Sequence, residues 1–423
     1  MASVVGFVRR VRQVASPPSP PKAPDALKFG ILGAANIAPA ALIGPARSHP
    51  EVIVQAVAAR SKDKAEAYAK KHGIPQVFDD YQALLDDPAI DAVYIPLPNG
   101  LHYEWAHKAL AAGKHVLLEK PSVSNAAEAE HLFLSPPSPP TGTTRPVLLE
   151  AFHYRFHPAW RHFLSLLSPP DIAHALSTAV IPGTLIFGKD DIRFQYPLAG
   201  GAMMDLGTYP LSSLREVFAA APEECLASAV ETCPPPNEKC DASFEVSFRF
   251  PNGGVGEVRG SLAVPLWKFA IPRLEVTHKG VVVPDTELPD GQEKVRVRKV
   301  AMANFMMPTL WHRIDVEDEW VVRVKGGGGA EGEEVVKKWT TRESKKVYNP
   351  REDGRDAPGE DWWLTYRYQL EEFVNRVRGR PGSGAWVSGE DSVAQMRMLD
   401  QAYLKAGLPL RPTTFTAPAE GTQ

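Results

Sequence analysis

The sequence predicts an α/β protein of two domains, in which a doubly wound parallel sheet precedes an α+β domain with a mostly antiparallel open sheet. Between residues 27 and 150, short and almost wholly apolar segments alternate with amphipathic helical patterns, which is typical of a parallel sheet covered on both faces. After residue 151 this alternation stops, and longer segments of alternating apolar and polar residues predict an antiparallel sheet with one solvated face. The length of 423 residues fits two or three domains of ordinary size.

The first domain, residues 27–150, is expected to contain five strands and five helices. The strands are expected at 27–32, 52–59, 91–98, 114–121 and 146–152, and the helices at 36–47, 62–73, 80–87, 99–112 and 124–134. A proline-rich segment, 135–146, lengthens the connection before the last strand. This alternation predicts a nucleotide-binding architecture.

The second domain, residues 151–410, is expected to begin with a helix and to continue as a sheet. The expected elements are a helix at 157–167, strands at 243–250, 255–264, 273–283 and 293–300, an exposed excursion at 325–360, and helices at 360–378 and 388–406. The last helix starts at Ser388 as its N-cap and stops at Gly407. Residues 411–423 are expected to form a tail.

A separate segment, residues 1–26, precedes both domains. Apolar residues at helical spacing predict a helix over 3–14 with arginines on its opposite side. The chain has 40 prolines, and five of them lie within residues 1–24, which makes 15–24 an extended linker. Three interpretations of the helix stay open: contact with the protein or a membrane surface, a disordered tail, or a mitochondrial presequence, since the segment contains arginine and no acid.

Composition limits the class of protein. Hydrophobic residues make up 44 % and charged residues 23 %, which excludes general disorder, collagen and coiled coils. The net charge of −3 does not suit a nucleic-acid-binding protein, and no run of about 18 apolar residues predicts a transmembrane helix. Cys225, Cys233 and Cys240 have no nearby histidine, so we expect no metal site, free thiols on a surface loop, and a reducing compartment such as the cytoplasm.

A dinucleotide-binding turn is predicted after the first strand. Gly33, Ala35 and Ala38 occupy the three positions of a G-x-G-x-x-G fingerprint, and Asn36 and Ile37 lie in the same turn. The turn opens a helix, whose unpaired N–H groups and positive dipole end attract a pyrophosphate.

The end of the second strand predicts which dinucleotide binds. An NAD site usually carries an acid there for the ribose hydroxyl, but no Asp or Glu lies between Val52 and Lys62, and Arg60 and Ser61 stand at this point. Because an arginine can stack on adenine and pair with a 2′-phosphate, we expect NADP. The alternative is a solvated basic start of the following helix.

Three further segments carry a family resemblance. They read YIPLPNGLH at 94–102, Glu-Lys-Pro at 119–121 and GGAMMDLGTYP at 200–210. In this order, after the nucleotide-binding pattern, they resemble the Gfo/Idh/MocA oxidoreductase family over residues 27–410, apart from 135–146 and 325–360. The tyrosine that ends the third segment, with the run EAFHYRFHP, is similar to the branch of NADP-dependent D-xylose dehydrogenase and dimeric dihydrodiol dehydrogenase. The resemblance implies a Rossmann cofactor domain, an α+β second domain and a homodimer.

The residue types also suit hydride-transfer chemistry on a hydroxyl. Such a reaction needs a group that takes the hydroxyl proton; a free tyrosine has a pKa of about 10, and a lysine ammonium beside it lowers that value. Tyr209 with Lys120 is therefore a candidate acid/base pair, and the resemblance implies that Lys120 orients the substrate hydroxyl. Asp205 is expected to orient Lys120 or a sugar hydroxyl. The alternatives are a surface lysine and an ordinary core tyrosine.

Several residues near these motifs are candidate ligands. The loops after the parallel strands line the cofactor crevice, and their candidate cofactor contacts are Pro98, Asn99, His102, Glu119 and Lys120. The candidate substrate contacts are Phe152, Arg155, Asp205 and Tyr209. His102 as a helix cap, and His153 and His157 as sugar contacts or as core or cap residues, are alternatives that the sequence leaves open.

These observations predict an NADP-dependent dehydrogenase that oxidises the C1 hydroxyl of an aldopyranose such as D-xylose to D-xylono-1,5-lactone. The enzymatic alternatives are oxidation of a trans-1,2-dihydrodiol or another cyclic polyol, carbonyl reduction in the reverse direction, and an NAD-dependent glycosidase, against which Arg60 argues. A catalytically silent dinucleotide-sensing regulator is the non-enzymatic alternative. The expected partner is a small sugar or polyol, without nucleic acid, and any membrane contact is expected only through residues 3–14.

Overall fold

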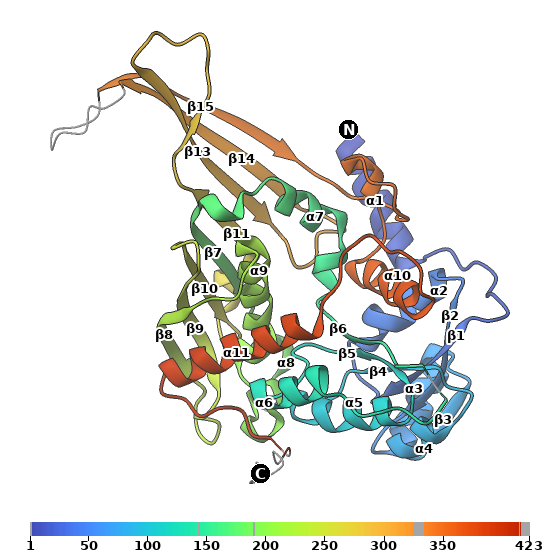
Figure 1. Ribbon diagram of the computed structural model, residues 1–423. Helices are drawn as coiled ribbons and strands as arrows, with labels where there is room; N and C mark the ends of the chain where they lie inside the picture. The colour runs from blue at the N-terminus through green and yellow to red at the C-terminus, as the bar shows by residue number, and fades with distance from the viewer. Residues whose placement is uncertain (1, 143, 189–190, 325–333, 414, 416–423) are drawn as a thin grey trace.

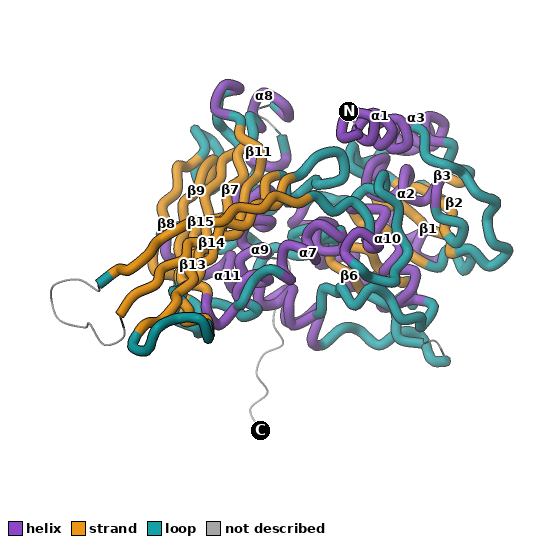
Figure 2. The backbone as a smooth tube through the Cα atoms, turned by 90° about the horizontal axis from the view of Figure 1, so that it is seen from above, coloured by secondary structure: helices purple, strands orange, loops and turns teal. Residues whose placement is uncertain are grey.

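The computed structural model describes residues 2–142, 144–188, 191–324, 334–413 and 415 of the chain. Two sheets form the framework, one of six strands and one of nine. They lie side by side, with helices packed between and around them (Figure 1). Seen from above, the nine-stranded sheet occupies one side of the molecule and the parallel sheet the other (Figure 2). The predicted α/β class with two kinds of sheet is confirmed.

The first sheet is wholly parallel and has the strand order β3-β2-β1-β4-β5-β6. Its strands are β1 (Leu27–Leu32), β2 (Val52–Ala58), β3 (Gln76–Phe78), β4 (Ala92–Ile95), β5 (His115–Leu118) and β6 (Leu148–Glu150). Its helical segments are η1 (Pro39–Ile43), α2 (Gly44–Ser48), α3 (Lys62–His72), α4 (Tyr81–Asp86), η2 (Asn99–Leu101), α5 (His102–Ala111), α6 (Ala126–Ala129) and η3 (Glu130–Leu134). The order reverses between β1 and β4, which is where dinucleotides bind in such sheets.

The second sheet has the order β15-β14-β13-β11-β7-β10-β9-β8, with β12 paired to β13. Its strands are β7 (Ile172–Val180), β8 (Glu224–Thr232), β9 (Asp241–Arg249), β10 (Val255–Ser261), β11 (Ala270–His278), β12 (Val281–Val283), β13 (Gln292–Ala303), β14 (Arg313–Val324) and β15 (Val335–Lys345). All pairs are antiparallel except β7 with β10. This matches the expected mostly antiparallel sheet.

Several elements of this half differ from the sequence prediction. Strand β15 lies within the expected excursion 325–360, of which 325–333 falls outside the described residues. It pairs with β14 along its length and is almost wholly exposed, so its composition resembles that of a loop. Strands β7, β8 and β14 were also not predicted, because alanine, serine and charged residues interrupt their apolar pattern. The three cysteines are free as expected but buried, which corrects the surface location.

Helices cover one side of the second sheet and reach across to the first. The helices here are α7 (Pro158–Ser165), α8 (Gly183–Phe187), α9 (Thr208–Phe218), α10 (Thr365–Val377) and α11 (Gly389–Lys405). Helix α9 packs on β7 and β10, and α11 packs on β8. Helix α10 instead packs on η1 and α2 of the first half, and its Phe373 ring also meets that of Phe29 on β1, with centroids 5.6 Å apart. The C-terminal part of the chain therefore contributes to the core of both halves.

The predicted N-terminal helix is present as α1 (Ala2–Ala15), and it lies beside α10 and α2 (Figure 1). It is attached through Arg10, which is buried. The Arg10 guanidinium lies 3.6 Å from the ring centroid of Tyr348 and donates to the Leu310 carbonyl at 3.0 Å. Val4 and Val8 point away and are exposed. None of the helices in the described ranges has the length and hydropathy needed to cross a membrane.

Candidate active site at the joint of the two halves

The turn after β1 has the backbone that a dinucleotide site needs. Gly33 has φ of +112°, which favours glycine, and a Cβ there would lie 3.1 Å from the Leu97 side chain. Asn36 and Ile37 follow and are exposed, and their amides have no hydrogen-bond partner among the described residues. Ala38 is then the N-cap of the helical segment η1. Exposed amides ahead of a helix start fit a pyrophosphate.

The end of β2 presents a free positive group beside this turn. Arg60 is exposed, and no carboxylate in the described parts of the chain lies within ion-pair distance of it. Ser61 caps α3, with its hydroxyl oxygen accepting from the Lys64 amide at 3.4 Å. Lys62 is already paired with Asp79 at 2.8 Å. Arg60, at the end of β2, is thus available for a 2′-phosphate.

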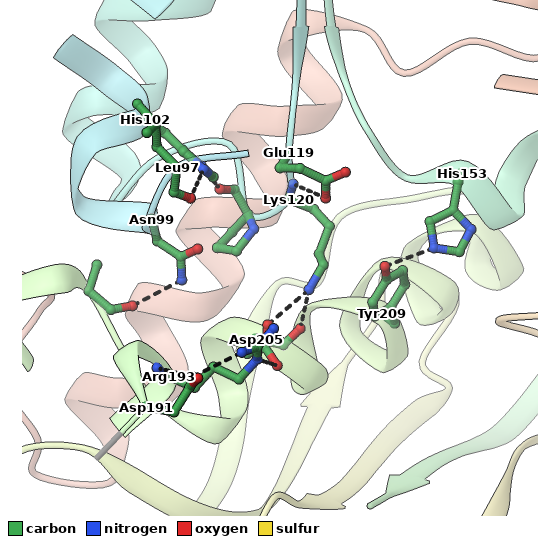
Figure 3. Close-up of polar contacts among 12 residues, drawn as sticks. Leu97, Asn99, His102, Glu119, Lys120, His153, Asp191, Arg193, Asp205 and Tyr209 are labelled. Atoms are coloured by element: carbon green, nitrogen blue, oxygen red, sulfur yellow. Dashed lines mark hydrogen bonds and ion pairs between the residues drawn. The ribbon is translucent and has the colours of Figure 1, made fainter. Parts of the chain in front are cut away.

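The loop after β4 connects the two halves, and its histidine is buried. Asn99, which follows Pro98, donates to the Ala199 carbonyl at 3.1 Å. His102 is fully buried, with Nδ1 2.8 Å from the Pro121 carbonyl oxygen and Nε2 2.7 Å from that of Leu97 (Figure 3). Burial lowers its pKa to about 4. The neutral ring has one N–H and donates to one of these two carbonyl oxygens, so the imidazole is packed into the scaffold. A contact between His102 and the cofactor stays a prediction.

The loop after β5 carries Lys120. Its Nζ donates to the Asp205 carbonyl oxygen at 2.7 Å and lies 3.2 Å from Asp205 Oδ1 (Figure 3). The predicted link between Asp205 and Lys120 is therefore present in the structure. The preceding Glu119 is buried and accepts from the Tyr94 hydroxyl at 2.6 Å.

Asp205 lies on η8 (Met203–Gly207), a π-helical turn just before α9. Its Oδ2 accepts from Arg193 Nε at 3.0 Å, and Arg193 Nη1 donates to Asp191 at 2.9 Å. Burial tends to raise the pKa of Asp205, but the charges of Lys120 and Arg193 outweigh burial, so the pKa is lowered. The result is a carboxylate held between two cations.

Tyr209, the first-turn tyrosine of α9, lies next to Lys120. The lysine Nζ is 4.9 Å from the ring centroid of Tyr209, whose hydroxyl is 2.8 Å from Nε2 of His153 (Figure 3). Burial, followed by the charges of Tyr366 and Glu119, raises the pKa of Tyr209 well above 10. The expected lowering by Lys120 is therefore wrong in direction, because the ammonium is bonded to Asp205 and burial dominates.

The two other predicted substrate contacts have different surroundings. Phe152 is buried and packs edge-on against the Tyr209 ring, with centroids 6.2 Å apart. Arg155 is also buried, but its guanidinium is bonded to Glu216 on α9 and to Asp391 on α11. The structure thus brings Phe152 to the site and engages Arg155 in an ion-pair network behind it.

Of three neighbours of Lys120 and Tyr209, sequence reasoning missed Arg193 and Tyr366 and left the role of His153 open. Arg193 holds Asp205, His153 holds the Tyr209 hydroxyl, and Tyr366 on α10 lies against His153 with ring centroids 4.1 Å apart. Arg193 precedes the GGAMMDLGTYP segment closely enough to have been suspected, whereas nothing near Tyr366 in the sequence marks it. Within the described ranges, no group of three or more His, Cys, Asp or Glu residues is arranged to hold a metal ion.

Family models match both halves of the chain. Residues 27–135 match an oxidoreductase family with an NAD-binding Rossmann fold, and residues 175–279 match the GFO/IDH/MocA C-terminal domain. The first match contains the turn at Gly33 and Lys120, and the second contains Asp205 and Tyr209. Both parts of the candidate site therefore lie inside matched regions.

Individual relatives are oxidoreductases. The chain is 37 % identical to D-xylose 1-dehydrogenase (NADP(+)) 2 of Haloferax volcanii over 241 residues, which cover 56 % of this chain and 70 % of the relative. It is 36 % identical to dTDP-3,4-didehydro-2,6-dideoxy-α-D-glucose 3-reductase of Actinomadura kijaniata over 188 residues, covering 44 % and 54 %. It is 32 % identical to trans-1,2-dihydrobenzene-1,2-diol dehydrogenase of Xenopus tropicalis over 197 residues, covering 46 % and 57 %. The chain thus spans little more than half the length of the last two.

The fold has close counterparts among solved structures. A 3-ketoreductase from Actinomadura kijaniata, in complex with NADP and TDP-benzene, aligns with a TM-score of 0.63 over 90 % of this chain and 98 % of its own, at 21 % identity. An aldose–aldose oxidoreductase from Caulobacter crescentus, in complex with glycerol, aligns with a TM-score of 0.63 at 17 % identity, over 90 % and 98 %. At such identities the alignments show a shared fold.

Proposed function

The chain belongs to the Gfo/Idh/MocA oxidoreductase family, and from this premise we propose that it is an NADP-dependent dehydrogenase oxidising the C1 hydroxyl of an aldopyranose, with D-xylose as the leading substrate and D-xylono-1,5-lactone as the product. One observation carries the proposal: Lys120, at the end of β5, has its Nζ on Asp205 and beside the ring of Tyr209. A cation and a phenol are thus together at the strand edge where cofactors of this fold bind. The 37 % identity to an NADP-dependent D-xylose dehydrogenase supports the choice of substrate.

The cofactor is assigned to the turn after β1 and the end of β2. The exposed amides of Asn36 and Ile37 bind the pyrophosphate, and Arg60 with Ser61 binds the 2′-phosphate. Pro98, Asn99 and Glu119 line the nicotinamide end on the neighbouring loops. NADP, when bound, supplies hydride acceptance from the substrate carbon.

The chain's own residues handle the substrate oxygen. Lys120 donates a hydrogen bond that orients the substrate hydroxyl and stabilises negative charge as it develops on that oxygen. Asp205 keeps the ammonium in place, since it binds the same Nζ through its carbonyl and its carboxylate. Tyr209 takes the hydroxyl proton and must be a phenolate to do so. Because burial raises its pKa well above 10, the oxidation accelerates as the pH rises.

A second candidate function is the reduction of a sugar carbonyl by the same pair. Burial keeps Tyr209 protonated at neutral pH, and a protonated phenol is the form that donates a proton to the carbonyl oxygen. The 3-reductases that act on dTDP-linked sugars are 35 to 39 % identical to this chain. Dehydrogenation of a trans-1,2-dihydrodiol uses the same residues and stays an alternative. The homodimer and the cytoplasmic location stay predictions.

The decisive experiment is a turnover assay in both directions. NADP reduction is measured with D-xylose, other aldoses, inositols and trans-1,2-dihydrodiols, and NADPH oxidation with keto sugars free and dTDP-linked. We expect the highest kcat/KM with D-xylose and NADP. A preference for a keto sugar would select the reductive function, and tight NADPH binding without turnover on any compound would select the dinucleotide-sensing regulator.

A further inference from the structure

We infer that His153 is a positioning residue for proton transfer: its neutral ring donates a hydrogen bond from Nε2–H to the phenol oxygen of Tyr209 and stabilises the phenolate form. This inference rests on the proposed function in one respect, namely that Tyr209 exchanges a proton with the substrate oxygen. It assigns a role to a buried histidine that the sequence left open between sugar contact and core residue.

The geometry fixes the contact tightly. His153 begins η4 (His153–Phe156), is 2 % exposed, and has Nε2 2.8 Å from the Tyr209 hydroxyl oxygen (Figure 3). The ring of Tyr366 lies against the imidazole with centroids 4.1 Å apart, and that of Tyr209 lies edge-on at 5.4 Å. The imidazole is thus held between two tyrosine rings, one from α9 and one from α10. It has little freedom to turn away from the phenol.

The other ring nitrogen identifies the tautomer. Nδ1 of His153 is buried and has no hydrogen-bond partner among the described residues. A buried N–H without an acceptor is rarer and less favourable than a buried lone pair without a donor. The proton therefore resides on Nε2, which makes His153 the donor and Tyr209 the acceptor in the 2.8 Å contact. Tyr209 keeps its own proton for an acceptor other than His153.

Burial, assisted by a nearby positive charge, keeps this histidine neutral. Burial, then the positive charge of Lys120, lowers the pKa of His153 to about 3. Other titratable groups also face the pair. They are Tyr366 from α10, Glu119 and Lys120 from the loop after β5, Asp205 from η8 and Tyr154 from η4. The Tyr366 hydroxyl hydrogen-bonds with Tyr209. His153 therefore does not itself take the substrate proton at neutral pH.

The step then balances without a second base. In oxidation, the substrate O–H bond breaks as the Tyr209 phenolate forms its O–H bond, and NADP, when bound, would accept the hydride from the substrate carbon. In reduction, the Tyr209 proton goes to the substrate oxygen, and the phenolate that remains accepts from His153. In both directions His153 keeps its proton, so its contribution is to the stability of the phenolate.

The kinetic test compares His153→Phe with His153→Gln, in which an amide N–H can approach the place of Nε2–H. We expect His153→Phe to lower kcat by roughly ten- to a hundredfold with little change in KM. We also expect the rise of the oxidation rate with pH to move to higher pH, because the phenolate loses a donor. We expect His153→Gln to restore most of kcat. His157→Gln is the matched control, since His157 is a buried histidine of the same segment that caps α7 through the Ala159 amide; its pH profile should match the wild type.

A double-mutant cycle separates this inference from the proposed function. If His153 acts through Tyr209, His153→Phe has no further effect on kcat once Tyr209→Phe is present. Full turnover in Tyr209→Phe alone would contradict the proposed function. If Tyr209→Phe loses turnover as expected, two results would overturn only the role of His153. One is an unshifted pH profile in His153→Phe. The other is a double variant in which the losses of kcat from the two single variants multiply.

A spectroscopic readout needs no substrate. In the NADP-bound protein with ¹⁵N-labelled histidine, the His153 resonances, identified by their loss in His153→Gln, should report a protonated Nε2 and a bare Nδ1. They should shift in Tyr209→Phe, where the acceptor is gone. A proton on Nδ1, or shifts unchanged by Tyr209→Phe, would refute the donor role.

Discussion

The cofactor half and the substrate half of the candidate site are built differently. On the cofactor half, the turn at Gly33 and the residues Arg60 and Lys120 each follow directly after a strand of the parallel sheet. On the substrate half, His153, Asp205 and Tyr366 come from η4, η8 and α10, which meet only through tertiary packing. Strand ends thus fix the cofactor contacts locally, whereas the environment of Tyr209 depends on segments distant in the sequence.

The sharpest test of this comparison is Lys120→Met, because Lys120 belongs to both halves. Removing the ammonium leaves the substrate oxygen without its donor and Asp205 with one cation fewer. We expect kcat to fall by at least roughly 10³-fold, with NADPH affinity, measured by fluorescence titration, changed by less than about threefold. Wild-type turnover would show that the reactive pair is misassigned.

Tyr209→Phe confines the change to the substrate half. The ring and its packing against Phe152 stay, and only the hydroxyl between His153 and the substrate is lost. We expect kcat to fall by roughly 10²- to 10³-fold. The residual rate of oxidation should lose the rise with pH that the raised pKa of the phenol gives the wild type. A pH profile of unchanged shape would assign the proton transfer to another group.

The comparison explains what the sequence could predict. The parallel sheet and the turn at Gly33 followed from apolar runs and a short motif, because strand ends of one sheet edge meet in space. The Lys120–Asp205 link followed from the motifs that carry the family resemblance. The pKa of Tyr209 did not follow, since it depends on burial and on Tyr366. Sequence position places His102 on the loop after β4 but does not reveal that its ring is buried between the carbonyl oxygens of Pro121 and Leu97.

Arg60→Asp tests the cofactor half alone. Its charge reversal faces the proposed 2′-phosphate, and the side chain has no ion-pair partner within the described residues to rearrange. We expect KM for NADPH to rise roughly ten- to a hundredfold, with KM for NADH changed little and kcat nearly constant. Lys64→Asp, on the same exposed helix start, is the matched control for the general effect of charge. Equal losses for both cofactors would refute the 2′-phosphate contact.

Arg193→Leu tests how much the substrate half depends on a residue that holds Asp205 in place. Arg193 touches Asp205 but has no contact with Lys120, so its removal leaves Asp205 less firmly held. We expect kcat to fall by about tenfold, and Arg193→Lys, which retains the charge, to recover part of it. An effect as large as that of Lys120→Met would indicate that Arg193 contacts the substrate directly.

The smallest effect is expected outside both halves, at helix α1. Arg10 is buried against Tyr348 and donates to the Leu310 carbonyl, and no residue of the candidate site is among these contacts. Arg10→Leu removes a cation–π contact and a hydrogen bond, so the free energy of unfolding should fall by about 1 to 2 kcal/mol in urea titrations. Arg12→Leu, on the exposed side of the same helix, should change it by less than about 0.5 kcal/mol. Turnover per folded molecule should stay constant in both variants, because the chemistry depends on the strand ends and on η4, η8 and α10; a lower kcat in Arg10→Leu would mean that docking of α1 also shapes the site through α10.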